Sequence, residues 1–399
     1  MRNDAPVRAT LPGLGLAIAA LLALAAIAAS WRGSALRAGA PEGSDLPSTV
    51  FLVAASCAFA LYLGAVYLVR RRGTSVAVVC AIAVAIQLVP LIGPLVISRD
   101  VYAYWAYGRL AAVHHVNPYT VSPARFAQDP ASRAMATGWR TSKSVYGPVF
   151  SAASAGLAAT NGHSSRGAEL GYRIAGGAGM LAVTALAAVV APAPAFAAAF
   201  VGWNPLLAVD FAGGGHNDVW MMAFVLGALV LAARRPRLAG VSLAIAGGLK
   251  WVVLGVFPLK LLSAERRQAL LIALGFCATA AVLAAVASVF FGTAWVTTLG
   301  TFAHRRSDWA IPSRLQQAGL PRWLALVPLL IFVPLLVRSA RAGRPRLGLA
   351  SLLVLVATPW LLPWYAAWAV PLAAIEEDRL AWVLALAFCA YILPDGIPF

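Results

Sequence analysis

Asp100 is the carboxylate of this sequence best placed to act as a general base. It comes directly after the apolar run 75–97 and opens a stretch rich in tyrosine and tryptophan, 100–109. If this stretch is helical, Asp100, Tyr104 and Tyr107 share one face, because residues three and four positions apart are neighbours on a helix. A carboxylate accepts hydrogen bonds from hydroxyl groups, and tyrosine rings can pack on the apolar C–H surface of a sugar ring. The pattern suggests sugar chemistry at a membrane boundary, although a helix cap followed by an interfacial aromatic belt would use the same residue types.

Elimination leaves few other acids for this role. The chain has only 14 acidic residues, and most of them fall in predicted termini or loops. Asp100, Asp210 and Asp218 are the exceptions, and all three fall at the predicted outer membrane boundary. An acid at that depth is costly unless it faces protein or a water-filled cavity. We interpret Asp210 as a structural, hydrogen-bonded acid and keep Asp100 and Asp218 as candidates for chemistry.

The composition indicates the class of protein. Of 399 residues, 61% are hydrophobic and 11% are charged, and the apolar residues form runs of about 20, the length that crosses a bilayer. We predict an all-α polytopic membrane protein, a single domain over 1–399, with about 11 to 13 transmembrane helices. The candidate spans are 14–29, 50–69, 75–97, 169–190, 194–211, 219–233, 238–262, 269–291, 323–337, 347–362, 365–374 and 382–392.

The formal charge of +17 does not indicate a nucleic-acid partner. In a membrane protein, arginines in short clusters between apolar runs are typical of cytoplasmic loops. The four cysteines, Cys57, Cys80, Cys277 and Cys389, lie inside apolar runs without close pairing. They predict neither a disulfide framework nor a zinc site.

The arginine clusters predict how the chain crosses the membrane. Clusters at 70–72, 234–237, 265–267 and 338–346 should face the cytoplasm. An even number of crossings must then separate the first two clusters, yet five apolar pieces lie between them. The shortest piece, 149–160, would be only about 18 Å long as a helix, so we predict that it is interfacial or re-entrant.

This topology places two loops and one polar turn on the exterior face, namely 98–168 with its interfacial helices, 292–321 and 213–218. In the turn, His216, Asn217 and Asp218 can bind substrate hydroxyls, because the preceding glycines allow close approach of the backbone. The alternative is a polar turn that caps the next helix. In the second loop, Arg305, next to His304, can assist with a phosphate or contact lipid headgroups.

Lys250 is a cation within an apolar run. The run 238–262 has arginines at both ends, and Gly247 and Gly248 offer a break in its middle, so we predict a broken hairpin that dips in and returns. One continuous span is the rival interpretation. A cation inside the membrane points to a functional site unless it snorkels to the headgroups. Here it could stabilise an anionic phosphate leaving group.

Six short motifs follow one another along the chain. They are Asn117-Pro118-Tyr119-Thr120, Val145-Tyr146-Gly147-Pro148, Trp203-Asn204-Pro205-Leu206, Gly215-His216-Asn217-Asp218, Gly248-Leu249-Lys250 and Pro363-Trp364-Tyr365. With Asp100, this ordered set resembles the GT-C glycosyltransferases, and within them the polyprenol-phosphomannose-dependent α-1,6-mannosyltransferases of bacterial cell envelopes. The resemblance extends from about Ser98 to Trp368, and it rests on the order of the motifs, since each motif alone is weak.

The resemblance implies a function. Members of this family have a multi-span bundle, an acidic base in the first large exterior loop and a polyprenyl-phosphate sugar as donor. Asp100 matches the base. The motifs supply the candidate substrate-binding residues Asn117, Tyr119, Tyr146, His216, Asn217, Asp218, Lys250, Trp364 and Tyr365. Helical spacing beside Asp100 adds Tyr104 and Tyr107, and the second exterior loop adds Arg305. The sequence has Arg99 before Asp100 and not a second acid, so we expect no metal and no cofactor.

The expected protein is therefore a glycosyltransferase in the lipid bilayer of the cytoplasmic membrane, with its active site on the exterior face. It would move a hexose, mannose by resemblance, to an exterior glycan or glycolipid acceptor with inversion. One alternative is a transporter or flippase of lipid-linked sugar, which would also have broken helices and an intramembrane cation. The other is a GT-C enzyme that uses another sugar.

Overall fold

The computed structural model describes residues 10–37, 44–255, 257–297 and 305–398. The longer helices are α2 Thr10–Ser30, α3 Asp45–Arg72, α4 Val76–Leu88, α5 Asp100–Ala112, α7 Pro148–Asn161, α8 Ser165–Val190, α11 Asp218–Ala232, α12 Pro236–Leu249, α14 Arg266–Phe291, α17 Val327–Arg341, α18 Leu347–Ala357 and α20 Arg379–Ile392. Shorter helical pieces are η1 Val89–Ile92, α6 Pro130–Ala134, α9 Pro194–Gly202, α10 Pro205–Ala208, η4 Val209–Gly213, η5 Trp251–Gly255, α13 Phe257–Leu262, α16 Ile311–Gln317, η7 Arg322–Leu326, η8 Pro363–Trp368 and α19 Val370–Ile375.

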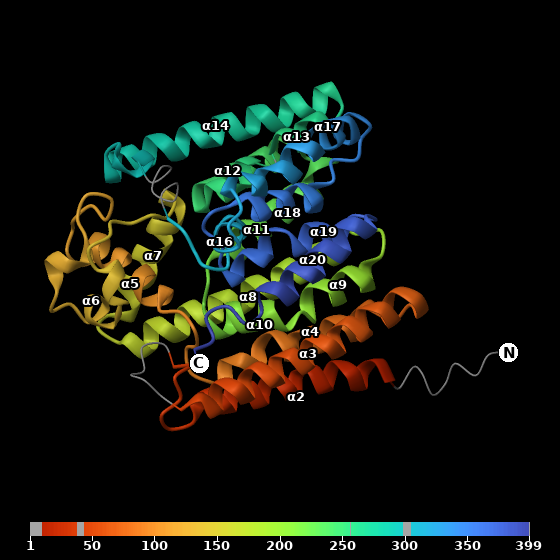
Figure 1. Ribbon diagram of the computed structural model, residues 1–399. Coiled ribbons are helices and arrows are strands. Elements are labelled where there is room, and N and C mark those ends of the chain that lie inside the picture. The colour runs from red at the N-terminus through yellow and green to blue at the C-terminus, as the bar shows by residue number, and fades with distance from the viewer. Residues whose placement is uncertain (1–9, 38–43, 256, 298–304, 399) are drawn as a thin grey trace.

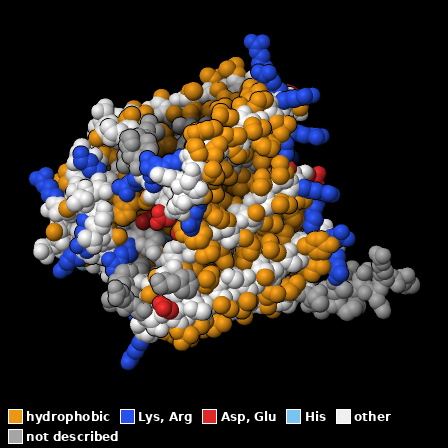
Figure 2. All heavy atoms as spheres, in the orientation of Figure 1, with side chains coloured by type: hydrophobic (Ala, Val, Ile, Leu, Met, Phe, Trp, Pro, Cys, Tyr) orange, Lys and Arg blue, Asp and Glu red, His pale blue; other side chains and the backbone are white. Residues whose placement is uncertain are grey.

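The prediction of an all-α polytopic membrane protein is confirmed. Five of the described helices are long and apolar enough to cross a bilayer, α2, α3, α8, α14 and η7 with α17, and the bent pair α9 with α10 and η4 makes a sixth. Five shorter apolar helices lie among them. The predicted 11 to 13 crossings require these shorter helices to cross as well. Figure 2 shows a broad hydrophobic surface over this bundle, as a bilayer requires.

The helix ends that carry the arginine clusters lie together. Helix α3 ends in three arginines, and Arg70 forms an ion pair of 3.4 Å with Glu377, just after α19. The end of α11 meets the start of α14, where the Gln268 side chain donates to the Ala232 carbonyl. In Figure 1 these ends lie on one side of the bundle, and α5, α6 and α7 form a lobe on the opposite side. Clusters and lobe therefore lie at opposite ends of the long helices.

The lobe contains the first predicted exterior loop. The piece predicted not to cross is α7, which has 14 residues and packs against α5 across the direction of the long helices. The predicted span 365–374 is also not one helix: it is divided between η8 and α19, and both are buried inside the protein. Because other helices surround η8 and α19, these two pieces do not need the length of about 20 residues that a helix in contact with lipid needs to cross the bilayer.

Two predicted spans are broken. Helix α12 ends at Leu249, Lys250 is extended, and the chain returns through η5 and α13. Both ends of this segment adjoin the contact between Ala232 and Gln268, so the chain turns back near Lys250, as the predicted hairpin requires. The predicted span 194–211 bends by 55° where Asn204 caps α10 by accepting from the next two backbone N–H groups along.

Candidate active site

Asp100 is the first residue of α5, and its side chain meets the polar turn between η4 and α11. The distance from Asp100 Oδ2 to His216 Nδ1 is 3.8 Å, and the Tyr104 hydroxyl lies 3.4 Å from the same nitrogen. The predicted spacing of Asp100 and Tyr104 therefore places both on the face that contacts His216. The structure brings together two segments that are more than 100 residues apart in the sequence.

The carboxylate of Asp100 does not cap its helix. Within the described ranges, no backbone N–H of the first turn of α5 donates to it, and the Asp100 N–H itself donates to Ser98 Oγ at 3.1 Å. The side chain keeps 23% of its surface exposed. Burial raises the pKa of Asp100 to about 6, and the positive charge of Lys250 offsets this only in part. A base with a pKa close to the working pH is well suited to proton abstraction.

Gly215 makes the turn that delivers His216. Its φ of 71° is in the left-handed region that favours glycine, and a Cβ there would lie 2.6 Å from a Val101 methyl group. The His216 ring then stacks on Trp364, with centroids 3.5 Å apart and planes 14° apart. Burial, with the charge of Lys250 second, lowers the pKa of His216 well below its usual range. His216 is thus a neutral imidazole that can accept or donate a hydrogen bond.

Lys250 is neutralised by an ion pair. Its Nζ lies 2.6 Å from Oδ1 of Asp218, whose side chain is fully buried, and Trp368 Nε1 donates to the same oxygen. Lys250 Nζ also lies 4.5 Å from the Tyr365 ring centroid and 5.0 Å from that of Trp368. Asp218 Oδ2 has no hydrogen-bond donor among the described residues. The site therefore contains a lysine whose charge is paired, and a carboxylate oxygen, Asp218 Oδ2, that could still accept a hydrogen bond from a ligand.

Tyrosines cover the space between Asp100 and α7. The Tyr104 and Tyr146 rings meet edge to face at 5.0 Å, and Tyr107 lies 6.1 Å from Tyr146. The motif that contains Tyr146 meets the motif that contains Lys250 because both have glycine at the contact. A Cβ on Gly147 would lie 2.1 Å from the Gly248 carbonyl oxygen, so the backbones touch there.

Arg305 lies at the rim of this aromatic wall. It donates to Ser142 Oγ at 3.3 Å, and the Tyr107 hydroxyl donates to the Ser142 carbonyl at 3.1 Å. Its guanidinium carbon lies 3.7 Å from the Trp139 ring centroid and 5.9 Å from that of Trp360. Arg305 is therefore connected to the site through Ser142. His304 lies outside the described residues.

Asn117 and Tyr119 lie behind the site. The Asn117 amide donates to the Phe291 carbonyl at 2.6 Å, and its oxygen accepts from the Tyr119 N–H at 2.9 Å. The Tyr119 hydroxyl donates to the Tyr146 carbonyl at 2.9 Å and lies 2.8 Å from Ser151 Oγ. The structure therefore places these two predicted binding residues as supports of Tyr146 and not beside Asp100.

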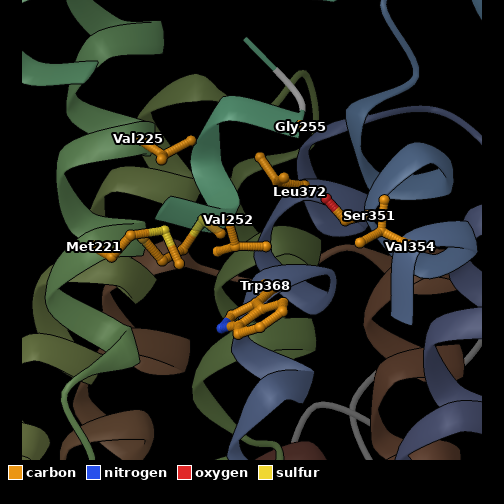
Figure 3. A pocket seen from close by; sticks show the side chains of 9 residues that line it. Met221, Val225, Val252, Gly255, Ser351, Val354, Trp368 and Leu372 are labelled. Carbon is orange, nitrogen blue, oxygen red and sulfur yellow. The ribbon is translucent and has the colours of Figure 1, made fainter. Parts of the chain in front are cut away.

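Sequence reasoning missed several residues of the site. Trp368, Ser142 and Trp360 contact predicted site residues but were not singled out. The only signal for Trp368 was its place three residues after Tyr365, whose ring it stacks on at 3.9 Å. Figure 3 shows the Trp368 ring beneath a small cavity of about 20 Å³, whose other labelled side chains are mainly aliphatic.

A buried ion pair holds the lobe together. Arg109 Nε donates to both carboxylate oxygens of Asp129 at 2.9 Å, and His114 Nε2 lies 2.7 Å from Asp129 Oδ2. The contact fixes α6 on α5, and thus the helix that carries Asp100. Asp210, expected to be hydrogen-bonded, is buried with its Oδ2 lacking a donor among the described residues.

Among the described residues, no group of three or more His, Cys, Asp or Glu side chains could hold a metal ion. What the arrangement offers is a carboxylate of raised pKa, a neutral imidazole, a paired lysine and a set of aromatic rings. This combination suits proton abstraction from a hydroxyl group and binding of a sugar.

Comparison with known proteins agrees with this chemistry. A family profile described as "Alpha-(1->6)-mannopyranosyltransferase, N-terminal domain" matches residues 12–265, more than half of the chain. The chain belongs to this family. The matched region contains Asp100, His216, Asp218 and Lys250, so most of the site lies in the family's shared part.

Curated relatives carry the same name. An alpha-(1->6)-mannopyranosyltransferase of Mycobacterium tuberculosis is 25% identical over 374 residues, 71% of this chain and 63% of its own length. Alpha-(1->6)-mannopyranosyltransferase B of Corynebacterium glutamicum is 24% identical over 75% of this chain and 60% of its own length. A probable alpha-(1->6)-mannopyranosyltransferase of Mycolicibacterium smegmatis is 28% identical over 71% and 62%. The chain thus matches 60–63% of the length of these relatives. No solved structure gives a significant match.

Proposed function

We propose that this member of the family transfers mannose from a polyprenyl-phosphate donor to an exterior glycan or glycolipid, with inversion at the anomeric carbon. The observation that carries the proposal is the carboxylate of Asp100, which does not cap its helix, has a raised pKa and faces His216. Family membership supports the sugar, and the helical bundle supports a lipid-linked donor.

Asp100 takes the proton of the acceptor hydroxyl as its oxygen attacks the anomeric carbon. The new C–O bond forms while the bond between that carbon and the phosphate oxygen breaks, and polyprenyl phosphate leaves as an anion. Lys250 shares its charge between Asp218 and the departing phosphate, and Arg305 supplies a second positive charge from the rim. No protonation of the leaving group is required, because a phosphate is stable as an anion.

The lobe at the end opposite the arginine clusters supports an exterior site. In a cysteine-free background, which requires replacing the exposed Cys57 and Cys277 among others, an impermeant thiol reagent should label a cysteine at the exposed position 163, in the turn between α7 and α8 of the lobe, in intact cells. A cysteine at position 71 should react only after permeabilisation. The reverse pattern would contradict the topology.

The test of the activity uses the purified chain in nanodiscs with radiolabelled mannosyl polyprenyl phosphate and a mannan-type glycolipid acceptor. We expect labelled product whose new linkage has the anomeric configuration opposite to that of the donor. Retention of configuration would refute direct displacement by the acceptor. Failure to form product, together with movement of intact donor between leaflets of vesicles, would instead identify a flippase.

A further inference from the structure

A cavity of about 360 Å³ opens between α7, α8, α11 and α12. Its wall is almost entirely apolar and includes Leu157 of α7, Ala175 of α8, Phe224 of α11 and Ile245 of α12. None of these four side chains is fully buried, and Ala153 at the cavity edge is exposed. Three of the four helices that line the cavity, α8, α11 and α12, are apolar helices of the bundle.

One end of this cavity is polar and adjoins the site. His216 and Asn217 line it there, and His216 is the residue that faces Asp100 at 3.8 Å. Leu249, also in the wall, immediately precedes Lys250. The cavity therefore begins beside the proposed base and the proposed phosphate-binding lysine.

Asn217 points to a ligand at this end. The residue is only 6% exposed, yet its Oδ1 has no hydrogen-bond donor among the described residues. A buried acceptor without a donor is costly, so such atoms are usually satisfied by a ligand or by water. A ligand that fits both features has a hydroxyl-bearing head and a long apolar body.

We propose that this cavity binds the phosphate-proximal isoprene units of the lipid carrier, while Asn217 Oδ1 accepts a hydrogen bond from a hydroxyl of the attached sugar. This inference rests on the proposed function and adds the place and direction of the donor. The sugar lies toward Asp100, the phosphate toward Lys250, and the chain leaves between α7 and α12 into the bilayer. The small cavity above Trp368, of about 20 Å³, is too small for a prenyl chain.

Two positions on α8 provide a matched test. Ala175 lines the cavity, whereas Ala178, less than one turn later, is exposed and lies outside its wall. Ala175→Trp should fill the cavity, and Ala178→Trp adds the same side chain to the lipid-facing surface. On α7, Ala153→Trp and Ala152→Trp form a second pair, because only Ala153 lines the cavity.

The probe is a decaprenyl phosphate with a diazirine in its first isoprene unit, applied to the full chain in nanodiscs and followed by peptide mass spectrometry. We expect labelling of α7, α8, α11 or α12 in the wild type. In Ala175→Trp or Ala153→Trp, half-maximal labelling should need at least about tenfold more probe, whereas both control variants should label like the wild type. A tenfold change corresponds to about 1.4 kcal/mol.

Labelling confined to other helices, equal labelling of all four variants, or displacement of the probe by phosphatidylglycerol as effective as by decaprenyl phosphate would overturn the inference. Labelling does not depend on sugar transfer. A protein that labels in this cavity but transfers no mannose would refute the proposed function and keep the prenyl site. A protein that transfers mannose but labels elsewhere would refute the prenyl site alone.

Discussion

Removing the charge of Lys250 should destabilise the protein more than removing that of Asp218. The Asp218 side chain is fully buried and depends on Lys250 and Trp368, whereas 18% of the Lys250 side chain is exposed. Lys250→Met leaves the buried Asp218 carboxylate without its counter-charge, a change that typically lowers the free energy of unfolding by about 3–5 kcal/mol. Asp218→Asn leaves a lysine that still has partial hydration and two ring faces, so the loss should be about 1–3 kcal/mol.

The double variant Lys250→Met with Asp218→Asn separates this ion-pair effect from a packing effect. No uncompensated charge remains, and the amide oxygen can still accept from Trp368. We therefore expect the double variant to recover most of the stability lost in Lys250→Met, with a clearly non-additive cycle. Activity should stay low in all three variants, since the cation for the leaving phosphate or its partner is lost.

The assay is unfolding in mixed detergent micelles, followed by tryptophan fluorescence. Lys260→Met is the matched control, because Lys260 is half-buried on α13 and forms no ion pair with any described carboxylate. Lys250→Met as stable as Lys260→Met would refute the reasoning, as would a double variant whose loss equals the sum of the single losses.

Three further predictions concern the pH dependence of transfer and the stability of the lobe. Because burial raises the pKa of Asp100 to about 6 and the base must be ionised, the transfer rate should rise as pH rises through about 6 and level off above it; a rate that is flat from pH 5 to 8 would contradict this. Asp129→Asn should lower stability by about 3–5 kcal/mol, because Arg109 then stays buried without its counter-charge; thermal melts measure this, and an unchanged melting temperature would contradict it. Although burial alone would raise the pKa of Asp129, hydrogen bonds from Arg109 and His114 hold it below its usual range. Its contribution should therefore be complete above about pH 4 and be lost as pH falls through the lowered value, which acid unfolding of the wild type and Asp129→Asn compares.

Local spacing and charge bias predicted the parts of the site that depend on nearby residues. The common face of Asp100 and Tyr104 follows from helical periodicity, and the break at Lys250 follows from its glycines and flanking arginines. For the turn at His216 and α5, the sequence predicted only that both lie on the same side of the membrane, and not that they are in contact. Topology restricts which segments can meet, but it does not give distances.

Partners in space could not be predicted. Lys250 and Asp218 are 32 residues apart, and Trp368 is 150 residues from Asp218, so no local pattern connects them. The same holds for Asn117, whose asparagine-proline motif indicates a turn but not the Phe291 carbonyl that its amide binds. Such contacts depend on how the helices pack against one another, and the spacing of residues along a single sequence does not determine that packing.

The most direct test of the central claim is the mannose transfer rate of Asp100→Asn, measured with saturating polyprenyl-phosphate mannose and with the melting temperature recorded alongside. Asparagine keeps the size of the side chain but removes the base, so we expect a loss of about 10²–10⁴-fold with little change in stability. Asp308→Asn, at an exposed position, should transfer like the wild type. Near-normal transfer by a folded Asp100→Asn protein would contradict the assignment of Asp100 as the base.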